Sequence, residues 1–147
     1  MDATLVLESI KLCVAMLFKE GGALMVQQTM YDHLSSTKSE LFFQQLRNMI
    51  QKLMMWHEWQ SVASKTTGEE AALPPELIVV RFMQLMCEGH YIYNQDIMRE
   101  QPNNNISINL LDDLASYLVC LGHLPCVTST TAALSVFATC LEVIQGP

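Results

Sequence analysis

Two carboxylates in this sequence stand where an apolar helix is expected to end. Glu88 closes the apolar run RFMQLMC and precedes Gly89 and His90, and Glu142 lies in LEVIQGP, just before a Gly-Pro pair. The C-terminus of a helix carries negative partial charge, which suits Lys or Arg better than a carboxylate. Both positions therefore need an explanation beyond helix formation.

Gln145 lies three residues after Glu142, on the same face of the predicted last helix and within the angle of its apolar stripe. Polar groups in such a place must face another element or a ligand, because their unpaired burial is costly. Carboxylate and amide oxygens are the ligands that a hard cation such as calcium prefers. Three side-chain oxygens are fewer than a calcium site needs, and no EF-hand pattern is present. Taken alone, Glu88 is interpreted as part of a solvated face with Arg81 and Gln84.

Other metal-type residues have weaker patterns. Cys120, His123 and Cys126 in CLGHLPC are possible zinc ligands, but they lack the usual C-x-x-C spacing and a fourth ligand. Buried thiols beside a loop histidine are the preferred interpretation. His57 and Glu58 in WHEW are not followed by a second histidine four residues on, so the metalloprotease helix is absent. No nucleophile triad, phosphate loop or paired-carboxylate motif is evident, and we expect no enzyme activity.

The composition bounds the kinds of partner. Of the 147 residues, 50% are hydrophobic and only 16% are charged, against about 25% charged in an average globular chain. This deficit predicts a piece of a larger assembly with part of its surface covered. The net charge is −7, and without a basic patch nucleic acid is an unfavourable partner.

The expected compartment is the cytosol. No apolar run reaches the roughly 20 residues of a membrane span, so we expect no insertion of this segment into a membrane. Asp2 and Glu8 stand where a secretory signal would carry positive charge. Five scattered cysteines are typical of reduced thiols.

Helical periodicity runs through the chain, without a convincing strand. A first helix begins after Asp2 as N-cap and ends at Gly21-Gly22, and a second covers about 23–34. Thr37 and Glu40 predict a capping box for a third helix, which runs through residue 59. Residues 61–75, SVASKTTGEEAALPP, predict a flexible internal loop.

Four more helices are expected after this loop. Pro75 suits the first turn of the fourth, and a short fifth helix ends near Glu100. Asn105 is the predicted N-cap of the sixth. Thr128 or Ser129 caps the last helix, whose predicted inner stripe comprises Leu134, Phe137, Ala138, Leu141 and Ile144. We therefore predict one all-α domain over 1–147, with about seven helices stacked as an irregular armadillo-like α-solenoid.

Several segments resemble one family in the same order along the chain. RFMQLMCEGH and LEVIQGP are similar to two motifs of the intracellular calcium-release channels, the ryanodine and inositol-trisphosphate receptors. EGGALMVQQTMYDHL, SELFFQQL and REQPNNNISINLL resemble neighbouring segments of the same region. The chain thus resembles the RIH-associated region of these channels, and its wording leans towards the ryanodine receptor.

This resemblance implies a function for the two carboxylates. In the family, the residues that correspond to Glu88, Glu142 and Gln145 form the activating cytosolic calcium site, which a threonine backbone carbonyl from the domain after the pore completes. The implied protein is a calcium-sensing and gating-coupling module of a homotetrameric ligand-gated channel. It would lie on the cytoplasmic face of the endoplasmic or sarcoplasmic reticulum, and alone it would bind calcium weakly.

An alternative of another class remains open. The low charge and ten methionines also suit a free-standing helical adaptor that binds a partner helix in an apolar groove, without channel activity.

Overall fold

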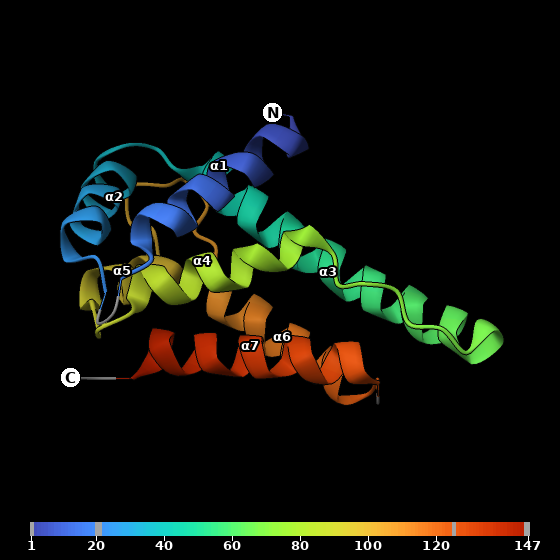
Figure 1. Cartoon of the computed structure of the whole chain (residues 1–147). Helices are drawn as coiled ribbons and strands as arrows, with labels where there is room; N and C mark the ends of the chain where they lie inside the picture. The colour runs from blue at the N-terminus through green and yellow to red at the C-terminus, as the bar shows by residue number, and fades with distance from the viewer. Residues whose placement is uncertain (1, 20–21, 125, 146–147) are drawn as a thin grey trace.

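The computed structural model describes residues 2–19, 22–124 and 126–145, and this part of the chain is all-helical (Figure 1). Its seven α-helices confirm the predicted fold class. In chain order, the elements are α1 (Ala3–Leu17), α2 (Leu24–Ser36), α3 (Glu40–Thr67), the 3₁₀ turn η1 (Pro75–Leu77), α4 (Ile78–Cys87), α5 (Ile92–Arg99), α6 (Leu110–Gly122) and α7 (Val127–Ile144). The predicted helix stops at Gly21 and at Gly146-Pro147 lie outside the described residues.

Three helices form a stack that determines where the chain brings polar groups together. In Figure 1, α4 lies between α1 and α7, and all three run in the same direction. Their C-terminal ends therefore lie at one end of the molecule, where α2 and α5 pack against each other. The long helix α3 and α6 pack together behind the stack, and α6 also packs on α7. This arrangement is compatible with a solenoid.

Helix α4 is the centre of the core because its sequence, IVVRFMQLMC, is apolar on almost every side. Only its start and two polar residues, Arg81 and Gln84, escape full burial. The fully buried residues are Val79, Val80, Phe82, Met83, Leu85, Met86 and Cys87. A helix buried in this way has a fixed position, and so does the residue that follows its last turn.

Two predicted caps at the start of α3 and α6 were wrong. Thr37 is not part of a capping box, since its hydroxyl donates to the carbonyl of His33 in the preceding helix. The N-cap of α3 is Ser39, whose N–H donates to Asn104 Oδ1 at 2.9 Å. Asn105 does not cap α6, and its N–H donates instead to the carboxylate of Glu40. Tertiary contacts between these two segments replace the local caps that the sequence offers.

Asn109 is the residue that caps α6, since its Oδ1 accepts from the N–H groups of Leu111 and Asp112. The last helix likewise begins earlier than predicted, with Cys126 as N-cap. Ser129, a predicted cap, is the third residue of the helix and closes a capping box with Cys126.

The predicted loop over 61–75 is partly helical. α3 continues to Thr67, and Gly68 ends it with a left-handed φ of 72° and an N–H bonded to Ser64 O at 2.8 Å. Residues 61–67 include no glycine or proline, so nothing local stops the helix at Ser61. The non-helical connection is thus shorter than predicted, from Gly68 to Pro74.

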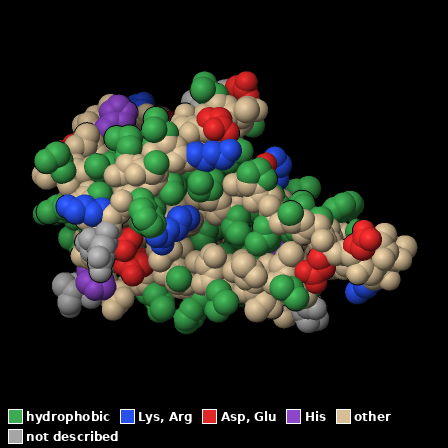
Figure 2. Space-filling view, in the orientation of Figure 1, with side chains coloured by type: hydrophobic (Ala, Val, Ile, Leu, Met, Phe, Trp, Pro, Cys, Tyr) green, Lys and Arg blue, Asp and Glu red, His purple; other side chains and the backbone are tan. Residues whose placement is uncertain are grey.

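The predicted inner stripe of α7 faces outward. Leu134 is 68% exposed, and Phe137, Leu141 and Ile144 are also exposed. The residues that face α4 and α6 are instead smaller or β-branched: Ser129, Ala132, Val136, Thr139 and Val143. These side chains allow α7 to lie close to α4, where the Thr139 hydroxyl donates to Val80 O at 3.1 Å. Figure 2 shows hydrophobic side chains along the edge formed by α7.

Among the described residues, α7 is the one helix long and apolar enough to cross a membrane by length and composition, with a mean hydropathy of 1.5. Of its residues, 28% are buried against the rest of the described structure. A single helix of this kind is weak evidence for a span.

His57, a candidate for chemistry in the sequence, is a core residue. It is 2% exposed, and its Nε2 lies 2.9 Å from the hydroxyl of the fully buried Tyr117. Burial lowers the pKa of His57 from its ordinary value of 6.5. The pair is therefore a hydrogen bond between α3 and α6 within the core.

We expect Tyr117→Phe to lower the free energy of unfolding by about 1–2 kcal/mol, because it leaves a buried imidazole nitrogen without a partner. Urea unfolding followed by circular dichroism measures this loss. Tyr93→Phe, which removes the same hydroxyl from a half-exposed ring, is the control and should change stability far less. Equal effects of the two variants would contradict this role of the pair.

Stability should also depend on the protonation of His57. Since the folded-state pKa lies below 6.5, the unfolded chain takes up the proton first as the pH falls. The contribution of His57 is therefore constant above pH 6.5 and is lost as the pH falls from there towards the folded-state pKa. Melting temperatures measured across this range should fall more steeply for the natural chain than for His57→Gln.

Candidate functional site

The C-terminal end of α4 is held by side-chain amides. The last carbonyls of a helix have no partner within it, and α4 has no basic residue in its last turn. Gln27 of α2, which is 2% exposed, donates from Nε2 to Leu85 O at 2.9 Å and to Glu88 O at 2.8 Å. Asn94 of α5, which is fully buried, donates to Met86 O at 2.8 Å. Neutral donors from two other helices thus satisfy these carbonyls.

The turn after Glu88 is tight. Gly89 and His90 both have left-handed φ values, of 78° and 61°, and the second is uncommon for a residue with a side chain. Tyr91 N–H returns to Cys87 O at 3.3 Å. This turn reverses the chain, so that α5 lies beside the C-terminal end of α4, whose carbonyl it binds.

The C-terminal end of α7 has the same kind of support. It too lacks a basic residue in its last turn. Gln95 of α5, which is 2% exposed, donates from Nε2 to Glu142 O at 2.7 Å and to Gln145 O at 2.9 Å. The neighbouring residues Asn94 and Gln95 therefore link one short helix to the ends of both α4 and α7.

Both predicted carboxylates have a buried oxygen without a partner. Glu88 Oε2 and Glu142 Oε2 are buried and accept no hydrogen bond from any described residue, and neither side chain makes an ion pair there. Nδ1 of His90 is likewise buried and unpartnered. Leaving a buried charged oxygen unpaired is costly. Carboxylates such as these are groups that a hard cation binds.

The electrostatics at this end of the molecule favour positive charge. The parallel helices α4 and α7 both direct their C-terminal partial negative charge here. Burial, and then the charge of Glu142, raises the pKa of Cys87 to about 12, while Arg99 acts in the opposite direction. Glu142 is thus close enough to act on the last residue of α4. The nearby cation Arg99 is itself paired with Asp96.

The three predicted ligands are not equally placed. Glu88 and Glu142 are half-buried, whereas the side chain of Gln145 is exposed at the residue that follows α7. Gln145 belongs to this end of the molecule through its backbone carbonyl, which Gln95 binds. Within the described ranges, no three His, Cys, Asp or Glu side chains form a group that could hold a metal ion. This finding speaks against the zinc hypothesis for Cys120, His123 and Cys126.

Sequence reasoning missed Gln27, Asn94 and Gln95, which hold the two helix ends, and the buried Nδ1 of His90. Gln27 lies 61 residues before Glu88, and no local spacing connects them. The available signal was weak: polar amides at helix positions that tertiary packing buries completely. His90 carries a clearer signal, since it lies two residues after Glu88 within the same motif.

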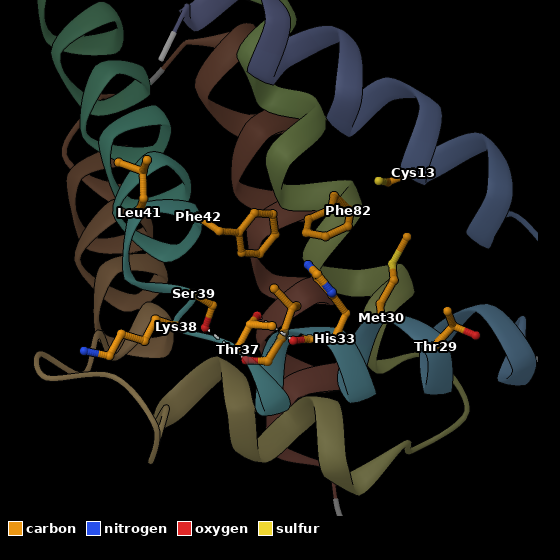
Figure 3. A pocket seen from close by; sticks show the side chains of 11 residues that line it. Cys13, Thr29, Met30, His33, Thr37, Lys38, Ser39, Leu41, Phe42 and Phe82 are labelled. Atoms are coloured by element: carbon orange, nitrogen blue, oxygen red, sulfur yellow. Dashed lines mark hydrogen bonds between the residues drawn. The ribbon is translucent and has the colours of Figure 1, made fainter.

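A hollow lies on another part of the surface, among α1, α2, α3 and α4 (Figure 3). It has a volume of about 500 Å³, and its lining is mostly apolar. Phe42 and Phe82 pack edge to face in its lining with ring centroids 6.0 Å apart, and Met30 and His33 point towards them. The hollow has the size of a small-ligand pocket, but it has few polar groups that would determine what enters.

The family model described as RyR and IP3R Homology associated matches residues 76–147. The matched region runs from η1 to the end of α7 and includes Glu88, Glu142 and Gln145. No solved structure matches the chain.

The description of this family spans both receptor types, so the match does not separate a ryanodine receptor from an inositol-trisphosphate receptor. It associates the chain with these channels and with domains that are not enzymes. Residues 76–147 of this chain are therefore a region of the RyR and IP3R Homology associated family.

Proposed function

We propose that this chain is a calcium-sensing and gating-coupling module on the cytoplasmic side of a tetrameric calcium-release channel. The observation that carries the proposal is the pair of buried, unpartnered oxygens on Glu88 and Glu142. They lie on helices that direct their negative ends to the same place. Calcium would supply the missing positive charge, and Glu88, Glu142 and Gln145 would contribute to its ligands.

A ligand from outside this chain completes the site in this proposal. Three side-chain oxygens leave most of the usual six to eight positions to other groups. In the channels that the sequence resembles, a backbone carbonyl of the domain after the pore contributes one. Calcium would then bind more tightly in the arrangement that brings the two domains together. This difference in binding free energy would shift the channel towards its open state.

The outer surface supports a place within a larger polypeptide of this family. The exposed residues on the outer face of α7 are apolar over several turns, including Leu134, Phe137 and Ile144. Apolar stripes of this extent are typical of surfaces that another protein element covers. The parent channel would lie in the endoplasmic or sarcoplasmic reticulum membrane, with this module in the cytosol.

The apolar hollow of Figure 3 favours the second candidate, an adaptor that binds a partner helix. In that function, Glu88 and Glu142 would have no part in a calcium response. The calcium dependence of the parent protein therefore separates the two candidates.

In the parent channel, we expect Glu88→Gln with Glu142→Gln to shift calcium activation to concentrations at least roughly tenfold higher, since charge count tunes calcium affinity over decades. Open probability in planar bilayers, recorded against cytosolic calcium, measures the shift. Glu58→Gln with Glu69→Gln removes the same charge from two exposed positions outside the site and is the control. An unchanged calcium dependence in the first pair would overturn the proposal.

The isolated chain should bind calcium only weakly, because it lacks the outside ligand. Isothermal titration calorimetry of the natural chain should give a dissociation constant well above the micromolar range. Micromolar binding that survives Glu88→Gln with Glu142→Gln would place calcium elsewhere. Micromolar binding that this pair abolishes would show that the chain needs no outside ligand.

A further inference from the structure

The two helix ends that carry the carboxylates are both anchored to the pair formed by α2 and α5. Gln27 of α2 binds the carbonyl of Glu88 itself, and Gln95 of α5 binds the carbonyl of Glu142 itself. Asn94 of α5 connects this helix to α2 and α4. Its Nδ2 lies 3.4 Å from Gln27 O of α2 and donates to Met86 O of α4. Each carboxylate therefore extends from a backbone position that a buried amide fixes.

The packing leaves little freedom at the first of these positions. A Cβ added to Gly22, whose φ is +91°, would lie 2.8 Å from Glu88 O and 3.3 Å from Gln27 Oε1. Gly22 thus lies directly against the Gln27–Glu88 contact. Glu88 cannot shift towards α2 without displacing backbone atoms.

The chemical nature of these anchors matters as much as their position. Lys or Arg would also bind the carbonyls at a helix end and would suit its partial charge. Such a side chain would bring a permanent cation beside Glu88 or Glu142 and would satisfy the carboxylate internally. An amide donates the same hydrogen bonds without charge, so one buried oxygen of each carboxylate remains unpaired.

We propose that Gln27 and Gln95 are positioning residues of the cation site, which fix the spacing of Glu88 and Glu142 while adding no competing positive charge. The inference rests on the proposed function, since it assumes that the two carboxylates share a cation. It goes further in assigning control of the site to α2 and α5. Gln27 lies outside the region that matches the family model.

The test uses the whole chain and lanthanum(III), a hard trivalent cation that resembles calcium in size and binds carboxylates more strongly. Titration calorimetry gives its affinity, and differential scanning calorimetry gives the melting temperature of each variant. Gln27→Met and Gln95→Met should each weaken lanthanum binding by about tenfold or more, as the loss of an outer support of a metal ligand commonly does.

Gln60→Met is the matched control. Gln60 is also 2% exposed, and its Nε2 donates to Glu69 O at 3.3 Å near the far end of α3. This variant removes a buried amide of the same size and should lower the melting temperature without a change in lanthanum affinity. If Gln27→Met and Gln95→Met lower affinity no more than Gln60→Met, their role is structural alone and the proposal is overturned.

Gln95→Lys tests the role of charge and keeps a donor for both carbonyls. We expect it to retain most of the melting temperature and still to lose lanthanum affinity by at least as much as Gln95→Met. Binding at the natural affinity would overturn the requirement for a neutral anchor. If a Met variant does not fold, the comparison of Gln95→Lys with the natural chain still tests the role of charge.

Glu88→Gln with Glu142→Gln distinguishes failure of the inference from failure of the proposed function. Natural lanthanum affinity in this double variant means that the cation binds elsewhere, and both proposals fail. Loss of binding in the double variant, together with unchanged binding in the Gln27 and Gln95 variants, overturns the positioning role alone.

Discussion

The last carbonyls of α4 and α7, which have no partner within their own helices, are the constraint on which the rest of this molecule depends. A helix that ends in a protein interior must find donors for its last carbonyls, because water is not there to supply them. Here the donors are the amides of Gln27, Asn94 and Gln95, all of which are buried. They fix α2 and α5 against the helix ends. The choice of neutral donors also leaves Glu88 and Glu142 with buried oxygens that no described residue satisfies.

The parallel course of α1, α4 and α7 makes this arrangement possible. Parallel helices direct the same ends, and hence the same partial charge, to one side of the molecule. Two carboxylates among negative helix ends are destabilising unless positive charge is added from outside. The same features that make this end electrostatically unfavourable in the isolated chain make it suitable for a cation ligand.

The outer face of α7 is apolar, although the inner face of this helix already packs on the core. Its small inner residues let the helix approach α4 closely, and its large apolar residues remain outside. The core is therefore complete without Leu134 or Phe137. An apolar surface that the folding of this chain does not need is typical of a chain that continues its packing with other elements.

Several local features were predicted correctly from the sequence, and others were not. The Asp2 cap and the proline turn before α4 depend on neighbouring residues, and both are present. The caps at Thr37 and Asn105 were wrong because Ser39, Asn104 and Glu40 join two segments about 65 residues apart. The inner face of α7 was wrong because periodicity identifies an apolar stripe but does not say whether close packing will prefer smaller side chains on another face.

The sequence by itself determined the helical class, the apolar helix α4 and the two motifs that carry Glu88 and Glu142, because these depend on residue types within a few turns. Only the tertiary structure decided which helix ends meet, which amides bind their carbonyls and which carboxylate oxygens remain unpaired. The physical reason is that a buried polar group takes its partner from whatever lies beside it in space. For the backbone carbonyl of Glu88, that partner is the side chain of a glutamine on α2, far away along the chain.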